Sequence, residues 1–275
     1  MALTDPLPTL EEFFDSIGSA GARLAAIDAT EGGAGNVSAC IGWPIEVRGQ
    51  LPVEEAIELP VAAPHLAGHT IIATGSGRRL RDLGRLPLQS LGAVVVGDDG
   101  RQGTLHTAVG RQFDLLTSEW NSHLAVHDDT VARTGTNFHA VVHAQPPHMT
   151  YLSHVRDYAD ERFYSRRLLR WQPETIVNLP KGIGVLPFML PGSEALMEAT
   201  VESLRRHRIV VWSKHGVMAR SDRSVTRAVD RIEYAEAGAR YEYMDLVAGR
   251  PAEGLTAAES QLLVRTFDVD TDLYE

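Results

Sequence analysis

Residues 137–154 read NFHAVVHAQPPHMTYLSH, and this stretch decides the fold because a strand in it leads directly into a helix. Residues 137–145 are mainly apolar and predict a strand. Two consecutive prolines then fix the direction of the chain, and residues 146–159 predict a helix. Side chains two apart on a strand share one face. We therefore expect His143 and Gln145 to point to the same side of the sheet.

Residues 9–27, upstream of this strand, predict the first helix. Thr9 and Glu12 stand at its start with the spacing of a capping box, in which each residue satisfies a backbone N–H of the other. The apolar positions follow the three-and-four spacing of one helix face. They are Leu10, Phe13, Phe14, Ile17, Gly21 and Leu24.

Helices and short strands alternate along the rest of the chain. Helices are predicted at residues 115–134, 192–207 and 224–247, and strands at residues 38–43, 69–75 and 175–188. Hairpins are predicted at residues 91–109 and 208–220, and tight hairpins join antiparallel strands. We expect an α/β fold of one domain over residues 1–275, with α/β/α layers around a mixed, largely antiparallel central sheet.

The composition restricts the classes of partner. Hydrophobic residues make up 44% and charged residues 23% of the 275 residues, as in ordinary globular proteins. The formal net charge of −10 argues against nucleic acid or an anionic membrane as the main partner. No apolar stretch approaches the roughly 20 residues of a membrane span. Cys40 is the single cysteine, and the N-terminal segment lacks the basic residues of a signal peptide, so we expect a cytoplasmic protein.

Histidines at two places suggest a metal site. His143 and Gln145 share a strand face, and His215 lies in the turn of the second hairpin. Histidine is a preferred ligand of zinc-like ions, and three protein ligands with an open position are typical of catalytic sites. The chain holds 11 histidines, however. Spacing alone therefore favours the ordinary interpretation of surface or hydrogen-bonded histidines.

Two further segments could bind an anion. Thr117, Ser118 and Glu119 stand just before a predicted helix and offer a hydroxyl group, free N–H groups and a carboxylate. Ser76 and Gly77 follow a predicted strand, where glycines let backbone N–H groups converge on an anion. A simple tight turn explains the second segment equally well.

Taken together, these segments resemble the class II aldolases of the fuculose-phosphate type. The resemblance runs in order along nearly the whole chain. The segments are GGAGN (32–36), TGSGRRLRDL (74–83), TSEWNSHLAVH (117–127), VVHAQP (141–146), PETIVNLPKGIGVLPFMLPGS (173–193) and VVWSKHGV (210–217). None identifies the family alone, but their order and separations together do.

The resemblance implies a metal site and two catalytic carboxylates. A divalent ion, Zn²⁺ in the family, would be held at the positions of His143, Gln145 and His215. Glu119 would be the acid/base residue that also touches the metal in the resting site, a role that suits a carboxylate whose pKa is raised by burial. Glu174 would be a second carboxylate, contributed across a subunit boundary. A solvated carboxylate beside Arg170 is the alternative for Glu174.

Gln145 departs from the histidine of the family, and three outcomes are open. Gln145 ligates the ion through its amide oxygen, which is a poorer zinc ligand than imidazole and admits Co²⁺ or Mn²⁺. Alternatively, His148 turns in from the next helix and replaces it. In the third case, the site holds little metal and catalysis is impaired.

The resemblance also implies the substrate, a ketose 1-phosphate. Its phosphate would be bound by Ser76, Gly77, Ser118 and Asn36, although Gly33 stands where relatives often have asparagine. The branch most similar to this chain cleaves L-rhamnulose 1-phosphate into dihydroxyacetone phosphate and L-lactaldehyde through a metal-stabilised enediolate. A homotetramer is implied as well. The alternatives are another sugar-phosphate aldolase, an epimerase, or a non-catalytic protein that binds sugar phosphates.

Overall fold

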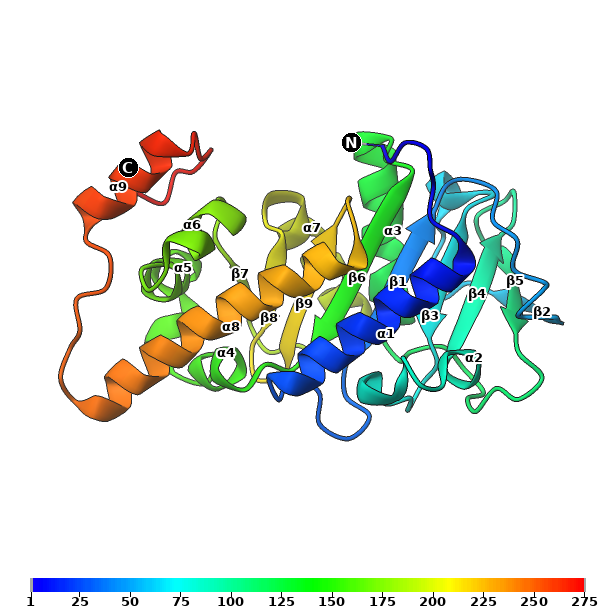
Figure 1. The fold of residues 1–275 in the computed structure, drawn as a ribbon, viewed down its shortest axis with the longest axis horizontal. Helices are drawn as coiled ribbons and strands as arrows, with labels where there is room; N and C mark the ends of the chain where they lie inside the picture. The colour runs from blue at the N-terminus through cyan, green and yellow to red at the C-terminus, as the bar shows by residue number, and fades with distance from the viewer. Residues whose placement is uncertain (1, 275) are drawn as a thin grey trace.

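A continuous sheet forms the centre of the computed structural model, which describes residues 2–274 (Figure 1). In this part of the chain, nine strands hydrogen-bond in the order β2-β5-β4-β3-β1-β6-β9-β8-β7. They are β1 (Asn36–Ile41), β2 (Val53–Glu58), β3 (Thr70–Thr74), β4 (Leu91–Val96), β5 (Gln102–Thr107), β6 (Phe138–Ala144), β7 (Gly184–Leu186), β8 (Ile209–Trp212) and β9 (Gly216–Ser221). The β7–β8 pair is parallel, while the other neighbouring pairs are antiparallel. The predicted mixed, largely antiparallel sheet is confirmed.

Helices cover both faces of this sheet. They are α1 (Leu10–Ala26), α2 (Pro87–Ser90), α3 (Trp120–Thr134), α4 (Pro147–Leu152), α5 (Glu161–Leu169), α6 (Pro173–Asn178), α7 (Glu194–Arg206), α8 (Val225–Ala248) and α9 (Ala257–Thr266). Helices α1 and α8 contact each other across one face, where α8 also contacts β6 and β9 (Figure 1). Helices α3 and α7 contact each other, with α3 on β6 and α7 on β7 and β8. The α/β/α layering is therefore as predicted.

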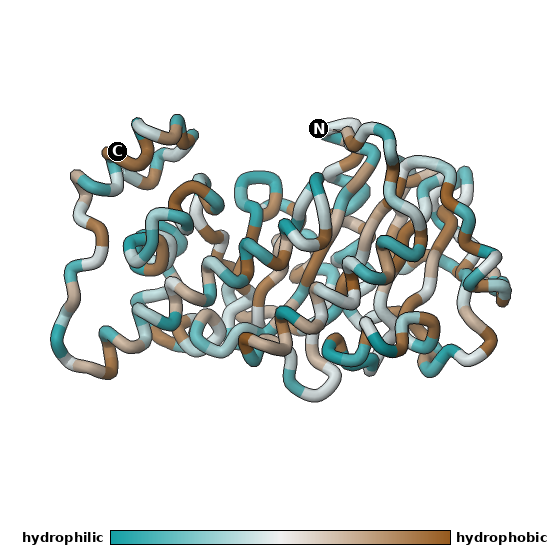
Figure 2. Tube along the Cα trace, in the orientation of Figure 1, coloured by the Kyte–Doolittle hydropathy of each residue, from teal (hydrophilic) through white to brown (hydrophobic). Residues whose placement is uncertain are grey.

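Helix α1 shows how the sequence produces these layers. Its capping box forms as predicted, with the Thr9 side chain accepting from the Glu12 N–H and the Glu12 side chain accepting from the Thr9 N–H. The predicted apolar face is buried against the sheet. Figure 2 shows the same division more widely, since hydrophobic residues follow the central strands while hydrophobic and hydrophilic residues alternate along the outer helices. Among the described residues, no helix is both long and apolar enough to span a membrane.

Two predicted elements are wrong. Residues 175–188, predicted as a strand region, begin inside helix α6, and only Gly184–Leu186 form a strand. Pro173 stands in the first turn of α6, where its missing N–H is harmless, and this signal outweighs the apolar run that follows. The helix predicted at residues 146–159 is broken: α4 ends at Leu152, and a separate 3-10 helix covers Arg156–Ala159. Strand β2 and helices α2, α5 and α9 were not predicted.

The register around β6 determines which side chains meet. Asn36 at the start of β1 pairs with His143 near the end of β6. On the other side, His143 pairs with Met218 of β9. The turn between β8 and β9 therefore lies at the same end of the sheet, and this turn carries His215. Three segments that are far apart in sequence converge at this end.

Candidate metal centre

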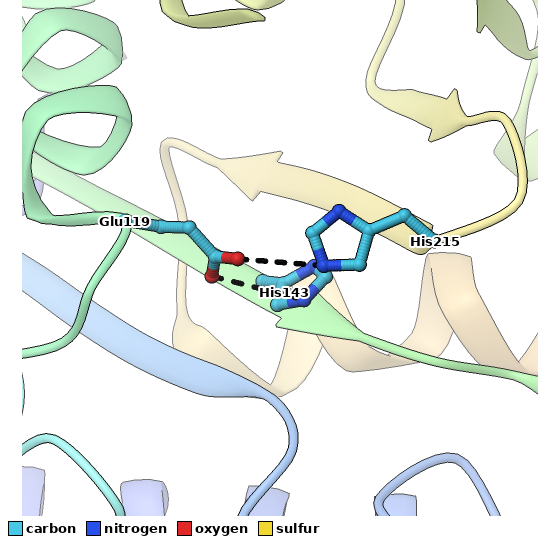
Figure 3. A group of neighbouring side chains, drawn as sticks. All are labelled: Glu119, His143 and His215. Atoms are coloured by element: carbon cyan, nitrogen blue, oxygen red, sulfur yellow. Dashed lines mark ion pairs between the residues drawn. The ribbon is translucent and has the colours of Figure 1, made fainter. Parts of the chain in front are cut away.

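Glu119, His143 and His215 form one compact group (Figure 3). Their potential ligand atoms all lie within 4.8 Å of one another. Nε2 of His143 is 3.7 Å from Oε2 of Glu119, and Nε2 of His215 is 3.5 Å from Oε1. The exposed fractions are 4% for Glu119 and 1% for His143, so the group is largely shielded from water.

A backbone contact orients the imidazole of His143. Nδ1 of His143 is 2.8 Å from the carbonyl oxygen of Val217, and because a carbonyl only accepts, this nitrogen carries the proton. Nε2 is left with a lone pair directed towards Glu119. The His143 ring also stacks on Trp212, with ring centroids 4.8 Å apart. Protein groups that fix the tautomer of a histidine in this way are typical of metal ligands.

The hairpin that carries His215 depends on Lys214 and Gly216. Lys214 has a φ of 66°, in the left-handed region that turns the chain between β8 and β9. A Cβ atom at Gly216 would lie 2.5 Å from the carbonyl oxygen of Ala144. Only glycine lets the turn approach the end of β6 so closely. His215 therefore stands beside His143, and its Nδ1 has no hydrogen-bond partner among the described residues.

Glu119 immediately precedes α3 and is held by Asn36. The Asn36 side-chain amide donates to Oε2 of Glu119 over 2.6 Å. Burial raises the pKa of the Glu119 carboxyl, whereas positive charge on His143 and the hydrogen bond from Asn36 lower it, as does positive charge on His123 or His215. The net pKa lies below its ordinary value. A pKa raised by burial, which suited an acid/base role, is therefore not found, and the resting carboxylate is ionised.

A buried polar chain continues behind Asn36. Oδ1 of Asn36 lies 2.5 Å from Nε2 of His123, so this nitrogen donates. The other ring nitrogen of His123 lies 2.6 Å from the hydroxyl oxygen of Ser38, which must then donate to it. Burial lowers the pKa of His123 to about 3, so the ring is neutral and its tautomer is fixed.

Two more histidines, His127 and His139, form the far end of this chain of hydrogen bonds. The Ser38 hydroxyl oxygen accepts from Nε2 of His127 over 2.7 Å, and Nδ1 of His127 lies 2.8 Å from Nδ1 of His139. Burial holds the pKa of both His127 and His139 well below the usual range. Every donor in the buried polar chain (Asn36, Ser38, His123, His127 and His139) therefore points along the chain towards Glu119. These three histidines were not among the predicted site residues, although His123 and His127 have the i, i+4 spacing of one helix face.

Gln145 and His148 take different positions. The Gln145 Cγ atom and the His143 Cε1 atom would each lie 3.1 Å from a Cβ atom at Gly216, so the Gln145 side chain reaches the corner occupied by the two histidines. His148 is held elsewhere, because its Nδ1 lies 2.6 Å from Oε1 of Glu236 and its N–H donates to the same carboxylate. Of the two, only Gln145 lies beside the metal-binding group.

The predicted phosphate-binding residues lie on adjoining loops. The N–H of Ser76 donates to Leu115 over 2.8 Å, and that of Thr117 donates to Thr74 over 3.0 Å. Ser76 and Ser118 line one cavity of about 840 Å³, with Trp120 beside them. The glycine-rich loop approaches from the other side, since a Cβ atom at Gly33 would lie 3.4 Å from the carbonyl oxygen of Gly77. Asn36 is instead engaged by Glu119 and His123.

Glu174 does not join the group within one chain. It stands in the first turn of α6 and is exposed, and its backbone carbonyl accepts a hydrogen bond from the Asn178 side chain. The structure therefore brings together Glu119, His143 and His215, with Gln145 beside them. It leaves Glu174 at the surface.

The donor set fits a divalent cation. Two neutral imidazoles and one ionised carboxylate suit zinc and similar ions. His215 Nδ1 is a buried nitrogen without a hydrogen-bond partner in the described part of the chain, and His143 Nε2 presents its lone pair to the same space. Glu119, His143 and His215 would hold such an ion, and the side chain of Gln145 begins beside them.

Comparisons with known proteins show which family the chain matches. The family model "Class II Aldolase and Adducin N-terminal domain" matches residues 15–243. The rhamnulose-1-phosphate aldolase of Bacteroides thetaiotaomicron is 31% identical over 188 residues, which are 68% of each chain. That of Klebsiella pneumoniae is 30% identical over 78% of this chain and 76% of its own.

A solved structure of an aldolase also matches this chain. The crystal structure of a sugar-phosphate aldolase from Thermotoga maritima superposes with a TM-score of 0.74 at 26% identity, covering 88% of this chain and 98% of that one. The class II aldolases are metal-dependent, and this chain has a group of side chains that could hold the metal. The family match over most of its length, together with these aldolase relatives, shows that the chain belongs to the class II aldolase and adducin family and is a lyase of the aldolase type.

Proposed function

We propose that this protein cleaves L-rhamnulose 1-phosphate reversibly into dihydroxyacetone phosphate and L-lactaldehyde. The observation that carries the proposal is the buried group of Glu119, His143 and His215, with ligand atoms within 4.8 Å of one another. The substrate is that of the rhamnulose-1-phosphate aldolases that match this chain at about 30% identity. Rhamnose metabolism is the corresponding context.

Glu119 is the residue proposed to move the proton at the reacting carbon. The carboxylate is ionised and can accept a proton, and its lowered pKa makes it a weaker base than a carboxyl whose pKa is raised by burial. In the direction of aldol addition, it takes the proton from the carbon next to the carbonyl of dihydroxyacetone phosphate. In the direction of cleavage, the hydroxyl group of the aldehyde half loses its proton as the carbon–carbon bond breaks, and Glu119, once protonated, delivers a proton to the same carbon. The hydrogen bond from Asn36 holds one oxygen, Oε2, in place during both steps.

His143, His215 and Gln145 are proposed to hold the divalent ion, zinc in the first instance, with Co²⁺ or Mn²⁺ admitted by the amide oxygen of Gln145. When bound, the ion supplies a Lewis acid that stabilises the enediolate charge. Trp212 packs on the His143 ring and keeps its orientation. The neutral amide of Gln145 leaves one fewer strong ligand than a third histidine would give.

Ser76, Gly77 and Ser118 are proposed to bind the substrate phosphate, with Asn36 at the inner end of this cradle. The two serines line a common cavity, and glycine at position 77 has a φ of 70°, which turns the loop. Glu174 is proposed to assist at the oxygen of the aldehyde half from a neighbouring subunit. The homotetramer and the cytoplasmic location stay predictions.

Elemental analysis of the purified protein, combined with a retro-aldol assay on L-rhamnulose 1-phosphate before and after chelation, tests the proposal. Stoichiometric metal and cleavage that is lost on chelation and restored by zinc, cobalt or manganese would support it. Bound metal without cleavage would point to a related aldolase or an epimerase. Absence of metal that no added ion corrects, together with absence of cleavage, would point to a non-catalytic binding protein.

A further inference from the structure

A second cavity, distinct from the metal centre, is lined by arginines. It has a volume of about 300 Å³, and its lining residues are Arg208, Arg220, Asp222, Arg223, Arg227 and Arg231. We call it the arginine cavity. The lining residues come from the start of β8, the end of β9 and the first turns of α8. Because β9 begins beside His215 and ends at Ser221, the cavity and the metal centre lie at opposite ends of that strand.

Arg231 shows that the cavity is not an ordinary solvated basic patch. Its exposed fraction is only 5%. Its guanidinium donates to the backbone carbonyl of Arg220, and no carboxylate pairs with it at hydrogen-bond distance among the described residues. Arginine is almost never buried without a partner that carries the opposite charge. Asp222 lines the same cavity and its charge acts on Arg231, so the cavity sets one carboxylate against several guanidinium groups.

Two of the neighbouring guanidinium groups are also bound to neutral acceptors and bring no carboxylate into the cavity. Arg220 donates to the carbonyl of Leu204 over 2.7 Å, and Arg208 donates to that of Asn178 over 3.3 Å. Arg227 does have a carboxylate nearby, with Asp230 at 3.4 Å. Positive charge thus exceeds negative charge among the lining residues, where Asp222 is the single acid.

The pKa values of the lining arginines reflect the same excess of positive charge. Burial, together with the charges of Arg208 and Arg220, lowers the pKa of Arg231 to about 9. Burial also lowers the pKa of Arg208 and of Arg220, while Asp222 opposes the shift in all three arginines. An anion inside the cavity would relieve this repulsion, because each guanidinium favours its charged form beside a negative charge.

We propose that the arginine cavity binds a small multivalent oxyanion, namely inorganic phosphate or the phosphate group of a small metabolite. Guanidinium groups bind phosphate through paired N–H donors. The first turns of α8, a helix of 24 residues, add the favourable end of a helix dipole. A volume of about 300 Å³ is at the small end of ligand pockets, so it suits a compact anion rather than a chain segment.

This inference does not depend on the proposed aldolase substrate, and its test separates the two sites. The full-length, metal-loaded protein is titrated with inorganic phosphate by calorimetry, and its thermal stability is measured in phosphate and in chloride at equal ionic strength. The variants are Arg231→Met, in the cavity, and Arg240→Met, an exposed arginine on the same helix as a matched control.

Wild type and Arg240→Met are expected to be stabilised by phosphate beyond chloride, whereas Arg231→Met should lose this increment. Its Kd at the cavity should rise roughly tenfold or more, since one charge-assisted contact is lost. Without phosphate, Arg231→Met should melt no lower than wild type, because the substitution removes an uncompensated charge. If Arg231→Met does not fold, Arg223→Gln at the exposed rim provides the same comparison.

Two outcomes would overturn the proposal. In the first, phosphate stabilises wild type and both cavity variants equally, which would place the bound phosphate elsewhere, as in the proposed catalytic cradle. In the second, phosphate stabilises wild type no more than chloride does, which would mean that the cavity does not bind phosphate. A further check is light scattering after gel filtration. Dissociation of an oligomer in the cavity variants, without any phosphate effect, would show that a carboxylate from another copy of the chain fills the cavity instead.

Discussion

The side-chain amide of Asn36 joins the metal centre to the buried polar chain: its nitrogen donates to Glu119 over 2.6 Å, and its oxygen accepts from His123 over 2.5 Å. Both halves of the amide are therefore used, and its orientation is determined by its partners. Because Asn36 pairs with His143 in the sheet, the same residue also lies beside a proposed metal ligand. Asn36 is thus a structural support of the site as well as a proposed phosphate contact.

Removing this amide should weaken both the fold and the site. Asn36→Ala leaves Glu119 without a donor and His123 without an acceptor in a buried region, and an unsatisfied buried group costs roughly 1–3 kcal/mol. We expect a loss of this size in the free energy of unfolding, measured by urea denaturation, together with slower cleavage. Asn178→Ala, which removes a hydrogen bond to the Glu174 carbonyl on a partly exposed helix, is the control. Equal stability of wild type and Asn36→Ala would contradict the prediction.

The Glu119→Gln variant should lose almost all cleavage and keep its fold. The neutral amide cannot accept the proton, and general acid–base catalysis contributes roughly 10²–10⁴ in rate. Its oxygen still accepts the hydrogen bond from Asn36, so the circular dichroism spectrum should be unchanged. The measurement is the initial rate of cleavage of L-rhamnulose 1-phosphate at saturating metal. A variant with wild-type activity would rule out this role for Glu119.

Metal affinity should depend on Gln145 and not on His148. Gln145→Ala removes the proposed amide ligand and should weaken zinc binding by roughly tenfold or more, while Gln145→His should strengthen it. His148→Ala should leave the affinity unchanged, because its ring is bound to Glu236. Competition with a chromophoric chelator measures all three. Loss of metal in His148→Ala but not in Gln145→Ala would exchange the two assignments.

Glu174 can act only from a neighbouring subunit, since it is exposed and outside the metal-binding group of its own chain. Glu174→Gln should therefore lower cleavage without lowering metal content. Mixing unfolded Glu174→Gln and Glu119→Gln chains and refolding them together should restore part of the activity, because some shared sites then contain both wild-type residues. If the mixture stays as inactive as its components, the site is not shared.

Stability should fall steeply below neutral pH because of His127 and His139. Their pKa in the folded protein lies well below the value of about 6.5 found in unfolded chains. As the pH falls below about 6.5, these histidines bind protons in the unfolded chain but not in the folded chain, so the free energy of unfolding decreases. Each histidine contributes up to roughly 1.4 kcal/mol per pH unit. His139→Gln should reduce this slope in melting experiments between pH 7 and pH 5, whereas His154→Gln, at an exposed position, should not.

The sequence predicted the layers of the fold better than the contacts of the site. Helices α1, α3, α7 and α8 and the two hairpins were predictable because their apolar spacing and turn residues are local signals. Helix α6 was not, since the apolar residues that follow Pro173 suit a short strand as well as a helix, and the signal for a helix start rests on Pro173 alone.

The contacts of Asn36 could not be predicted, because they depend on strand register. Nothing in the local sequence states that β1 and β6 pair so that position 36 faces position 143. The histidines at 123, 127 and 139 were likewise treated as ordinary hydrogen-bonded residues. Their hydrogen bonds join α3 to β1 and β6, and only the three-dimensional packing shows that Ser38 lies between two of the rings.

The one-way order of donors in the buried polar chain restricts how this protein can evolve. Reversing one link would set two donors or two acceptors against each other in a dry region, and removing one residue leaves its neighbours without a partner, so single substitutions in this chain are destabilising. Positions 36, 38, 123, 127 and 139 should therefore change together among close homologues. A designer who wishes to alter Asn36 has to redesign the other four positions with it.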